Sequence, residues 1–426
     1  MPSTLSEIVD RRLGAVVRRR LEDESVVVLQ GPRAVGKSTL LRALAASTDS
    51  EIVDLDDLAT RDAVHIDPAL FVRDRRPVLI DEFQHAPELL DAIKAELNRD
   101  DAPGRFILTG STRYSTLPAA AQALTGRAHR MEVLPLSQGE IAGTHEDFAR
   151  KLITDPGSLL DARLPASTRE EYVSRVVAGG FPPALRRART ADRTRWFNDY
   201  VDLVIERDVM ELTRVRQRRA LPLLLRALAS QTAQVLNIAK AAQRIGLEKS
   251  TAENYAKLLE SVFMVQQLPA WGTTLGSRVR SAPKVHVVDS GLAAHLLRLT
   301  EAKLAMASAQ ALTEFGHLLE TFVVGEVCKQ LDWLDAPVQR GHWRTGDGAE
   351  IDLVLEREDG MVAAVEVKAA SRVPATELHA LLNLRRKLGS QFLGGVVLYT
   401  GARAYSYEGN LHVVPIARLW SGAMRA

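Results

Sequence analysis

The sequence contains one cysteine and no long apolar run, and each shortage excludes a class of protein. Cys328 cannot form an intramolecular disulfide, so we expect a small buried thiol in a reducing compartment. No apolar stretch approaches the ~20 residues that a membrane-spanning helix needs. The N-terminal stretch also lacks the apolar core of a secretory signal peptide. We therefore expect a cytoplasmic protein without a membrane partner.

A strong net charge is also missing, because 55 basic residues face 53 acidic ones. The chain is no global polycation, so net charge alone decides little about its partners. Lysine is scarce, at only 11 of the 55 basic residues. The arginines that make up the rest can each bind two phosphate oxygens through a planar guanidinium. For the excess as a whole, codon bias in a GC-rich genome is the plainer explanation.

The 426 residues, of which 46% are hydrophobic and 25% charged, indicate a globular α/β protein of several domains. Residues 1–140 alternate short strand-like runs with helical patterns, which is typical of an α/β layer fold. The runs are 26–30, 51–55, 77–81, 105–110 and 129–136.

Three further units are expected after the first. Residues 141–220 predict a helical lid, and residues 221–300 predict a further, mainly helical unit. Residues 301–426 predict a separate small α/β domain, which begins with an amphipathic helix over 313–331. Its other predicted elements are strands at 350–356, 362–368, 393–399 and 411–416 and a helix at 377–388.

Residues 31–38 match the phosphate-binding pattern G-x-x-x-x-G-K-[ST] at every fixed position. The motif lies between a strand-like run and a helical stretch, which is the context that the pattern requires. Backbone amides of such a loop turn toward phosphate oxygens at a helix N-terminus. Lys37 would reach the β- and γ-phosphates, and Ser38 would bind Mg²⁺. The expected ATP-binding residues are Gly31, Pro32, Arg33, Ala34, Val35, Gly36, Lys37, Ser38 and Thr39.

The run over 77–81 ends at Asp81, and a second acidic residue, Glu82, follows directly. We expect Asp81 to hold Mg²⁺ through water and Glu82 to polarise the attacking water as a general base. The run over 105–110 leads to Thr109 and Ser111. A polar side chain there, Ser111 above all, would orient the water or the γ-phosphate, and a plain turn residue is the alternative.

In order along the chain, these motifs resemble those of AAA-type ATPases: a Walker A motif, an Asp-Glu Walker B motif and a polar sensor. In that family an arginine finger lies just before the fifth strand, and Arg127 occupies this place here. The resemblance implies a homo-oligomer, a hexameric ring, in which Arg127 neutralises charge on the γ-phosphate of a neighbouring subunit. Arg130 and Arg113 are the alternatives.

Two weaker motifs lie in the predicted lid. Residues 179–183, Gly-Gly-Phe-Pro-Pro, resemble a turn in signal-transducing relatives of the AAA proteins that packs near the nucleotide. An ordinary turn between helices is the alternative. Arg207, within Glu206-Arg207-Asp208, would either sense phosphate or form an ion pair within its helix.

Residues 237–260 predict a helix-turn-helix, with Gly246 at the turn and Ser250 as the cap of the second helix. Strand-like runs around a basic hairpin follow, which completes the outline of a winged helix. Such an element usually contacts DNA phosphates, although packing or oligomerisation is the alternative. The expected DNA contacts are Thr251, Asn254, Lys257, Arg278 and Arg280, with Lys284 in or near the wing.

Near the C-terminus, Asp352 lies in one predicted strand, and Glu366 and Lys368 share a face of the next. The pattern resembles the core of PD-(D/E)XK nucleases. That resemblance implies that Asp352 and Glu366 bind Mg²⁺ or Mn²⁺ and that Lys368 positions the nucleophilic water. It also implies a metal-binding role for Glu320 on the preceding helix, as in archaeal Holliday-junction resolvases. Related domains often keep the fold without activity, and the acids alone can form a solvated strand face.

The whole chain resembles a bacterial and archaeal family of AAA-type ATPases with a C-terminal domain of unknown function. Two functions are compatible with it. The first is an ATP-dependent motor that binds or remodels branched DNA in repair or recombination, with metal-dependent cleavage left open. The second is a nucleotide-dependent switch whose lid and C-terminal domain bind a partner and cut nothing. DNA-stimulated ATP turnover favours the first, which we prefer, and tight ADP retention without a DNA response favours the second.

Overall fold

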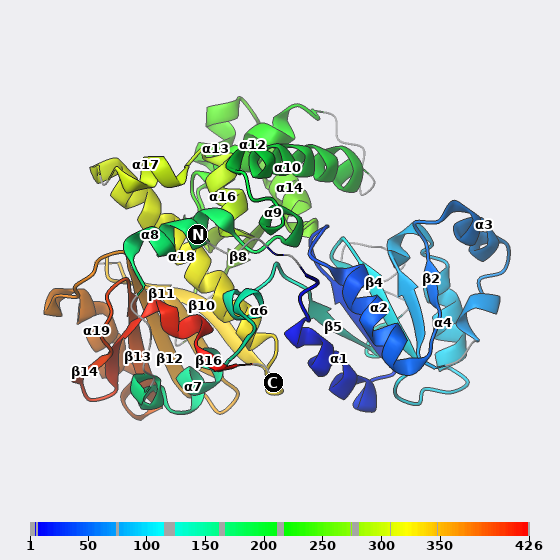
Figure 1. Cartoon of the computed structure of the whole chain (residues 1–426), viewed down its shortest axis with the longest axis horizontal. Coiled ribbons are helices and arrows are strands. Elements are labelled where there is room, and N and C mark those ends of the chain that lie inside the picture. The colour runs from blue at the N-terminus through cyan, green and yellow to red at the C-terminus, as the bar shows by residue number, and fades with distance from the viewer. Residues whose placement is uncertain are drawn as a thin grey trace.

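The structure is a computed structural model that describes residues 5, 7–73, 76–114, 124–161, 167–210, 217–272, 274, 281–306, 308–346 and 348–424. Figure 1 shows three parts: an α/β unit on the right, a helical segment at the top and a second α/β unit at the lower left. The long helix α18 (Ala309–Leu331) joins the helical segment to the second sheet.

The N-terminal sheet is parallel, with the strand order β2-β3-β4-β1-β5. Its strands lie where the apolar runs predict them, so the expected α/β fold of this unit is confirmed. Parallel pairing brings the carboxyl ends of the strands to one edge, where α/β proteins bind their ligands. The strands are β1 (Val26–Gln30), β2 (Ile52–Asp54), β3 (Val78–Asp81), β4 (Phe106–Gly110) and β5 (Ala128–Glu132).

Helices cover both faces of this sheet because its side chains alternate between two apolar clusters. Val27 and Leu29 pack with residues of α1 and α2, whereas Val26 and Val28 pack with residues of α4. The helices are α1 (Arg12–Asp23), α2 (Lys37–Thr48), α3 (Leu58–Ile66) and α4 (Leu89–Leu97), with short turns η1 (Leu70–Val72) and η2 (Phe83–His85).

The helical segment contains the predicted helix-turn-helix as α13 and α14, and Gly246 between them is left-handed, with φ 68°. Ser250 lies inside the first turn of α14 because that helix begins at Lys249, so its predicted role as the cap is wrong. A small sheet of order β7-β9-β8 lies beside them. The elements are α8 (Arg169–Ala178), α9 (Pro182–Leu185), α10 (Thr190–Leu203), the π-helical turn η5 (Val204–Val209), α12 (Ala220–Ala229), β7 (Gln234–Val235), α13 (Ile238–Ile245), α14 (Lys249–Ser261), β8 (Val265–Leu268), β9 (Lys284–Val287), α16 (Ser290–Leu296) and α17 (Glu301–Ala305).

The C-terminal sheet has the order β10-β11-β12-β13-β15-β14 and packs α18 on one face and α19 on the other. The predicted strands and helices are all present. Two strands were not predicted, because both lie at sheet edges and carry many polar residues. The elements are β10 (Val338–Arg344), β11 (Glu350–Arg357), β12 (Val362–Lys368), η6 (Ala375–Leu378), α19 (His379–Leu388), η7 (Gly389–Gln391), β13 (Phe392–Tyr399), β14 (Tyr405–Glu408), β15 (Leu411–Pro415), η8 (Ile416–Trp420) and β16 (Gly422–Met424).

Part of the predicted lid belongs to the C-terminal unit instead. β6 (Thr144–Glu146) pairs with β16, and α7 (Phe148–Thr154) buries its apolar face against α18 and the C-terminal sheet. The predicted unit over 141–220 is therefore divided, because helical periodicity does not show which sheet a helix covers. Two more elements lie in this stretch: α6 (Gln138–Ala142) and η4 (Pro156–Asp161).

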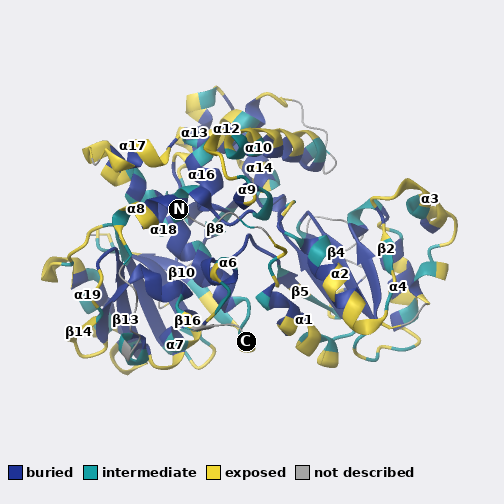
Figure 2. Ribbon diagram, in the orientation of Figure 1, coloured by how far each residue is buried: buried dark blue, intermediate teal, exposed yellow. Residues whose placement is uncertain are grey.

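Figure 2 shows the central strands of both large sheets buried, whereas the edge strand β14 is exposed and exposed residues follow the outer faces of the surrounding helices. No helix in the described ranges is both long enough and apolar enough to cross a membrane.

Candidate functional site

The loop between β1 and α2 forms an anion cradle at the carboxyl edge of the N-terminal sheet. Gly36 immediately before α2 is left-handed, with φ 96°, which favours a residue without a side chain. Lys37 is buried, and its ammonium donates hydrogen bonds to the carbonyls of Gly31 and Pro32 at 2.9 Å each. Burial lowers the pKa of Lys37, although nearby Glu82 opposes that effect. The ammonium is thus held by carbonyl oxygens that phosphate oxygens can replace.

Asp81, the last residue of β3, lies next to the start of α2. Its carboxylate accepts hydrogen bonds from the hydroxyls of Thr109 and Ser38, and burial raises its pKa. Hydroxyl and carboxylate oxygens are the hard ligands that Mg²⁺ prefers. The paired oxygens of Ser38 and Asp81 therefore fit the predicted Mg²⁺ site.

Glu82 follows in a strained conformation, with φ 53° and ψ 48°. A non-glycine residue costs about 1–3 kcal/mol there, and such strain concentrates at functional sites. Its amide donates to the Thr109 hydroxyl at 3.3 Å, and Gln84 bridges its carboxylate to the Ser111 hydroxyl. Burial alone would raise the pKa of Glu82, but Lys37, Gln84 and Arg33 outweigh it and lower the pKa. Glu82 is therefore ionised at neutral pH, as a general base must be.

The two predicted sensor residues, Thr109 and Ser111, contact different groups. Thr109 contacts the acidic pair itself, through the Asp81 carboxylate and the Glu82 amide. Ser111 reaches Glu82 only through Gln84, whose amide lies 3.1 Å from the Ser111 hydroxyl. The sequence pattern does not distinguish these contacts, because Thr109 and Ser111 belong to the same strand end, and a sensor role for either residue stays a prediction.

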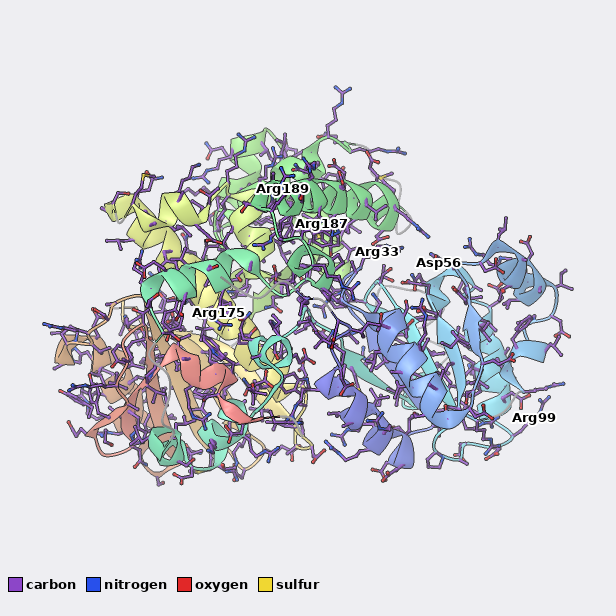
Figure 3. All side chains as sticks on the ribbon, in the orientation of Figure 1. Arg33, Asp56, Arg99, Arg175, Arg187 and Arg189 are labelled. Carbon is purple, nitrogen blue, oxygen red and sulfur yellow. The ribbon has the colours of Figure 1, made fainter. Side chains whose placement is uncertain are left out.

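The sequence did not predict the ion pair between Arg33 and Asp208, which connects the phosphate loop to the helical segment. The Nε atom of Arg33 donates to both carboxylate oxygens of Asp208, at 2.6 and 2.8 Å. Next to it, Arg207 pairs with Asp56 after β2, at 3.1 Å. Figure 3 places Arg33 and Asp56 at the edge of the N-terminal sheet that lies nearest the helical segment. Asp208 and Arg207 both lie in η5, a π-helical turn, and such turns are frequent at functional sites.

One part of Arg33 has no partner in the described part of the chain. Its second terminal nitrogen, Nη2, is buried and makes no hydrogen bond there. Burial would lower the pKa of Arg33, but Asp208 and Glu82 more than compensate and raise it. Arg33 therefore stays charged, with a donor left over beside Lys37 and Glu82.

Of the three candidate finger arginines, Arg127 and Arg130 lie before or on β5, whereas Arg113 follows β4 at the carboxyl edge of the sheet. Arg127 precedes β5, so it lies at the opposite edge of the parallel sheet, where it donates to Asn98 at 2.8 Å. It can only serve a neighbouring subunit, and that role stays a prediction. Arg113 instead donates to the Glu260 carbonyl at the end of α14 and pairs with Glu132. Arg130 lies exposed on β5.

The Gly-Gly-Phe-Pro turn joins the helical segment to the N-terminal unit. The Gly180 amide donates to the Asp289 carboxylate at 2.7 Å, and the Leu136 amide donates to the Gly180 carbonyl at 2.9 Å. Gly179 has φ 68°, and a Cβ there would lie 2.2 Å from Asp289. The following Pro182 lines a small cavity of about 40 Å³ beside the phosphate loop, together with Leu5, Ile8, Val9, Gly36, Thr39 and Arg186.

The predicted DNA contacts on α14 differ in exposure. Asn254 and Lys257 are exposed, whereas Thr251 is half-buried. Arg278 and Arg280 lie outside the described residues. Lys284 is not a surface residue of a wing, because only 1% of it is exposed and it lies inside the acidic cluster of the C-terminal domain.

The acidic cluster consists of Glu320, Glu350 and Asp352 around the Lys284 ammonium. The Nζ atom lies 2.6 Å from Glu320, 2.5 Å from Glu350 and 2.9 Å from Asp352. Burial would lower the pKa of Lys284, but the three carboxylates outweigh it and raise the pKa. The other oxygen of Asp352 accepts from the Val367 amide at 2.9 Å.

Glu366 and Lys368 form a separate pair on β12, as their spacing predicts. Their side chains lie 2.8 Å apart, and Lys368 also pairs with Glu377 at 2.6 Å. Burial, then repulsion from Asp352, raises the pKa of Glu366 to about 8. Lys368 is thus held by two carboxylates of its own.

The predicted metal ligands Glu320, Asp352 and Glu366 do not fit a metal ion as they stand. Two of them surround an ammonium, and the third is paired with Lys368. Across the described ranges, no group of three or more histidine, cysteine or carboxylate side chains is arranged to hold a metal. The sequence pattern did not find this because the ammonium comes from a distant strand, β9.

Comparisons with known proteins follow the same division of the chain. Residues 23–142 match the family described as an AAA domain, and residues 169–303 and 315–419 each match a domain of unknown function. Uncharacterized proteins of Mycobacterium bovis and Mycobacterium tuberculosis are each 28% identical over 418 residues, which is 96% of this chain and 84% of theirs.

Solved structures resemble the chain only distantly. A Walker-type ATPase of Pyrococcus abyssi has 17% identity and a TM-score of 0.42, over 70% of this chain and 98% of its own. AMPPCP-bound DnaA of Aquifex aeolicus has 12% identity and a TM-score of 0.25, over 61% and 91%. The AAA match and the geometry of the phosphate loop together support a P-loop ATPase domain of the AAA type within residues 23–142.

Proposed function

We propose that this ATPase uses its nucleotide state to control a DNA-binding winged helix. The observation that carries the proposal is a continuous connection from Glu82 to α14. Gln84 links Glu82 to Ser111, and two residues later Arg113 contacts the end of α14. The Arg113 amide donates to the Ser261 carbonyl at 2.9 Å, and its guanidinium lies 4.5 Å from the ring centre of Phe263. A change at the γ-phosphate would therefore move the helix expected to meet DNA.

Hydrolysis would use groups that the chain already holds in place. Lys37 and the loop amides bind the phosphates, and Glu82 removes a proton from the attacking water. Ser38 and Asp81 would hold Mg²⁺, which neutralises phosphate charge when bound.

Arg33 would supply a further cation to the γ-phosphate. Its buried, unpartnered nitrogen lies in the phosphate loop itself, and Asp208 fixes the guanidinium through two hydrogen bonds. A preorganised donor stabilises charge that develops in the transition state. Asp208 is then a positioning residue, and it ties the helical segment to the presence of the third phosphate.

Two observations support DNA binding: the order of the secondary-structure elements, and the exposure of two polar side chains on α14. Helix, strand, two helices and two strands follow one another from α12 to β9, which is the order of a winged helix. Asn254 and Lys257 are exposed on α14. Arg278 and Arg280 stay predictions, as does a ring in which Arg127 acts in trans.

Charge reversal on α14 tests the proposal. We expect duplex or forked DNA to stimulate wild-type ATP turnover, and Lys257→Glu to remove the stimulation while leaving DNA-free turnover intact. Lys94→Glu, at an exposed position on α4 of the ATPase unit, is the matched control and should behave as wild type. Binding should also weaken steeply with salt, because each phosphate contact releases about one counterion.

A different result would favour the partner-switch function. If neither duplex nor forked DNA changes wild-type turnover and the protein retains ADP, α14 is a packing or partner-binding helix. If Lys257→Glu and Lys94→Glu are stimulated equally, DNA binds elsewhere. Both outcomes leave the ATPase assignment intact.

A further inference from the structure

The Lys284 ammonium contacts Glu320 and Asp352, two of the residues that the sequence pattern predicts as metal ligands. Its three N–H donors face three carboxylates at 2.5–2.9 Å, so every donor has an ionic partner. Lys284 is 1% exposed, which excludes a solvated surface pair. The acids do not form the solvated strand face that is the alternative for such a pattern.

The lysine and the acids come from different parts of the fold. Lys284 begins β9 of the small sheet beside α14, whereas Glu320 lies on α18 and Glu350 and Asp352 lie on β11. The same two parts meet again through backbone bonds. The His342 amide donates to the Pro269 carbonyl at 2.9 Å, and the Trp271 amide donates to the His342 carbonyl at 2.6 Å. The cluster therefore lies in a continuous interface between the small sheet and the C-terminal domain.

The negative charge of the acidic cluster explains why it holds either the Lys284 ammonium or a divalent ion. Glu320 and Asp352 are largely buried and Glu350 is partly exposed, and acidic groups gathered in this way require a cation, because an uncompensated buried charge is strongly destabilising. A divalent ion binds oxygen ligands at about 2.1 Å and needs the same lone pairs that the ammonium uses. Both cations cannot be held by the same three carboxylates together.

We infer that Lys284 replaces the divalent cation in this cluster, so that the acids fasten the small sheet to the C-terminal domain and exclude metal. The domain then cuts no DNA while β9 is in place. This inference requires neither ATP binding nor DNA binding, so it stands or falls separately from the proposed function.

The test is metal binding by the full chain without nucleotide. Wild type, titrated with Mn²⁺ and followed by the electron paramagnetic resonance signal of the free ion, should bind none at the cluster. Lys284→Met removes the charge and keeps the length of the side chain. It should melt at a lower temperature than wild type, and Mn²⁺ should restore a few degrees. Adding Asp352→Asn to that variant should abolish the restoration.

Lys329→Met is the matched control, because Lys329 is a buried lysine that pairs with one carboxylate, Glu326, at 2.6 Å. It should also be destabilised, but Mn²⁺ should not restore it. If Lys284→Met does not fold, Lys284→Met with Glu350→Gln carries one negative charge less and serves instead. Asp352-dependent Mn²⁺ binding by wild type would overturn the inference. So would a Lys284→Met chain, or its Glu350→Gln substitute, that melts at the same temperature with and without Mn²⁺.

Discussion

Two buried lysines, Lys37 and Lys284, lie beside acidic residues in different domains, and their partners differ. Lys37 donates to two backbone carbonyls, with Asp81 and Glu82 nearby but engaged by other groups. Lys284 is bound directly by three carboxylates. Carbonyl oxygens release an ammonium to phosphate at little cost, whereas three carboxylates hold it. The same residue types thus form one site open to a ligand and one that is already filled.

The largest expected effect separates these two lysines. Lys37→Ala should lower ATP turnover by ~1,000-fold or more, because the developing phosphate charge loses its main cation. Lys284→Met should leave turnover per folded chain within about twofold. Steady-state phosphate release, corrected for folded protein by circular dichroism, measures both. A comparable loss in the two variants would remove the distinction between an open and a filled site.

The second-largest effect on ATP turnover is expected when the predicted general base, Glu82, is replaced. Glu82→Gln should lower turnover by at least ~100-fold and leave ATP affinity unchanged, because only proton removal needs the carboxylate. The lowered pKa of Glu82 also fixes the pH profile of the wild type. Because the base stays ionised below the ordinary pKa of glutamate, turnover should be flat from pH 8 down to about 5. Equal losses of ATP binding in Glu82→Gln and Lys37→Ala would contradict separate roles.

The ion pair over the phosphate loop should have a smaller effect. Asp208→Asn keeps the size of the side chain but loosens Arg33, and we expect roughly tenfold lower kcat with little change in KM. Arg33→Ala should in addition move the acid limb of the pH profile upward, since Arg33 is one cause of the low Glu82 pKa. A pH profile that stays in place would reduce Arg33 and Asp208 to a structural contact between domains.

The two sites also differ in how far the sequence predicts them. The nucleotide site comes from segments whose local pattern is sufficient: a loop motif, and two apolar runs that end in polar residues. Parallel pairing then brings Lys37, Asp81 and Thr109 to one sheet edge. Local pattern and strand order place these groups because Asp81 and Thr109 lie at the ends of buried strands, and Lys37 follows a buried strand through one short loop.

The acidic cluster could not be predicted in the same way. Glu320 and Asp352 were identified, but their cation lies 36 residues or more away in a strand that pattern assigns to a DNA-contacting wing. Nothing in the local sequence of Lys284 distinguishes a wing cation from a buried one. The pairing of Arg33 with Asp208 is likewise invisible, because it depends on how the helical segment docks on the sheet.

The nucleotide site is open to a ligand, whereas the acidic cluster is already filled by the Lys284 ammonium. The stoichiometry of Mn²⁺ binding to the full wild-type chain, measured with and without a non-hydrolysable ATP analogue, tests both halves at once. We predict no tightly bound ion without the analogue and one per chain with it. One ion per chain without the analogue and two with it would show that the C-terminal cluster takes a metal, and would contradict the account.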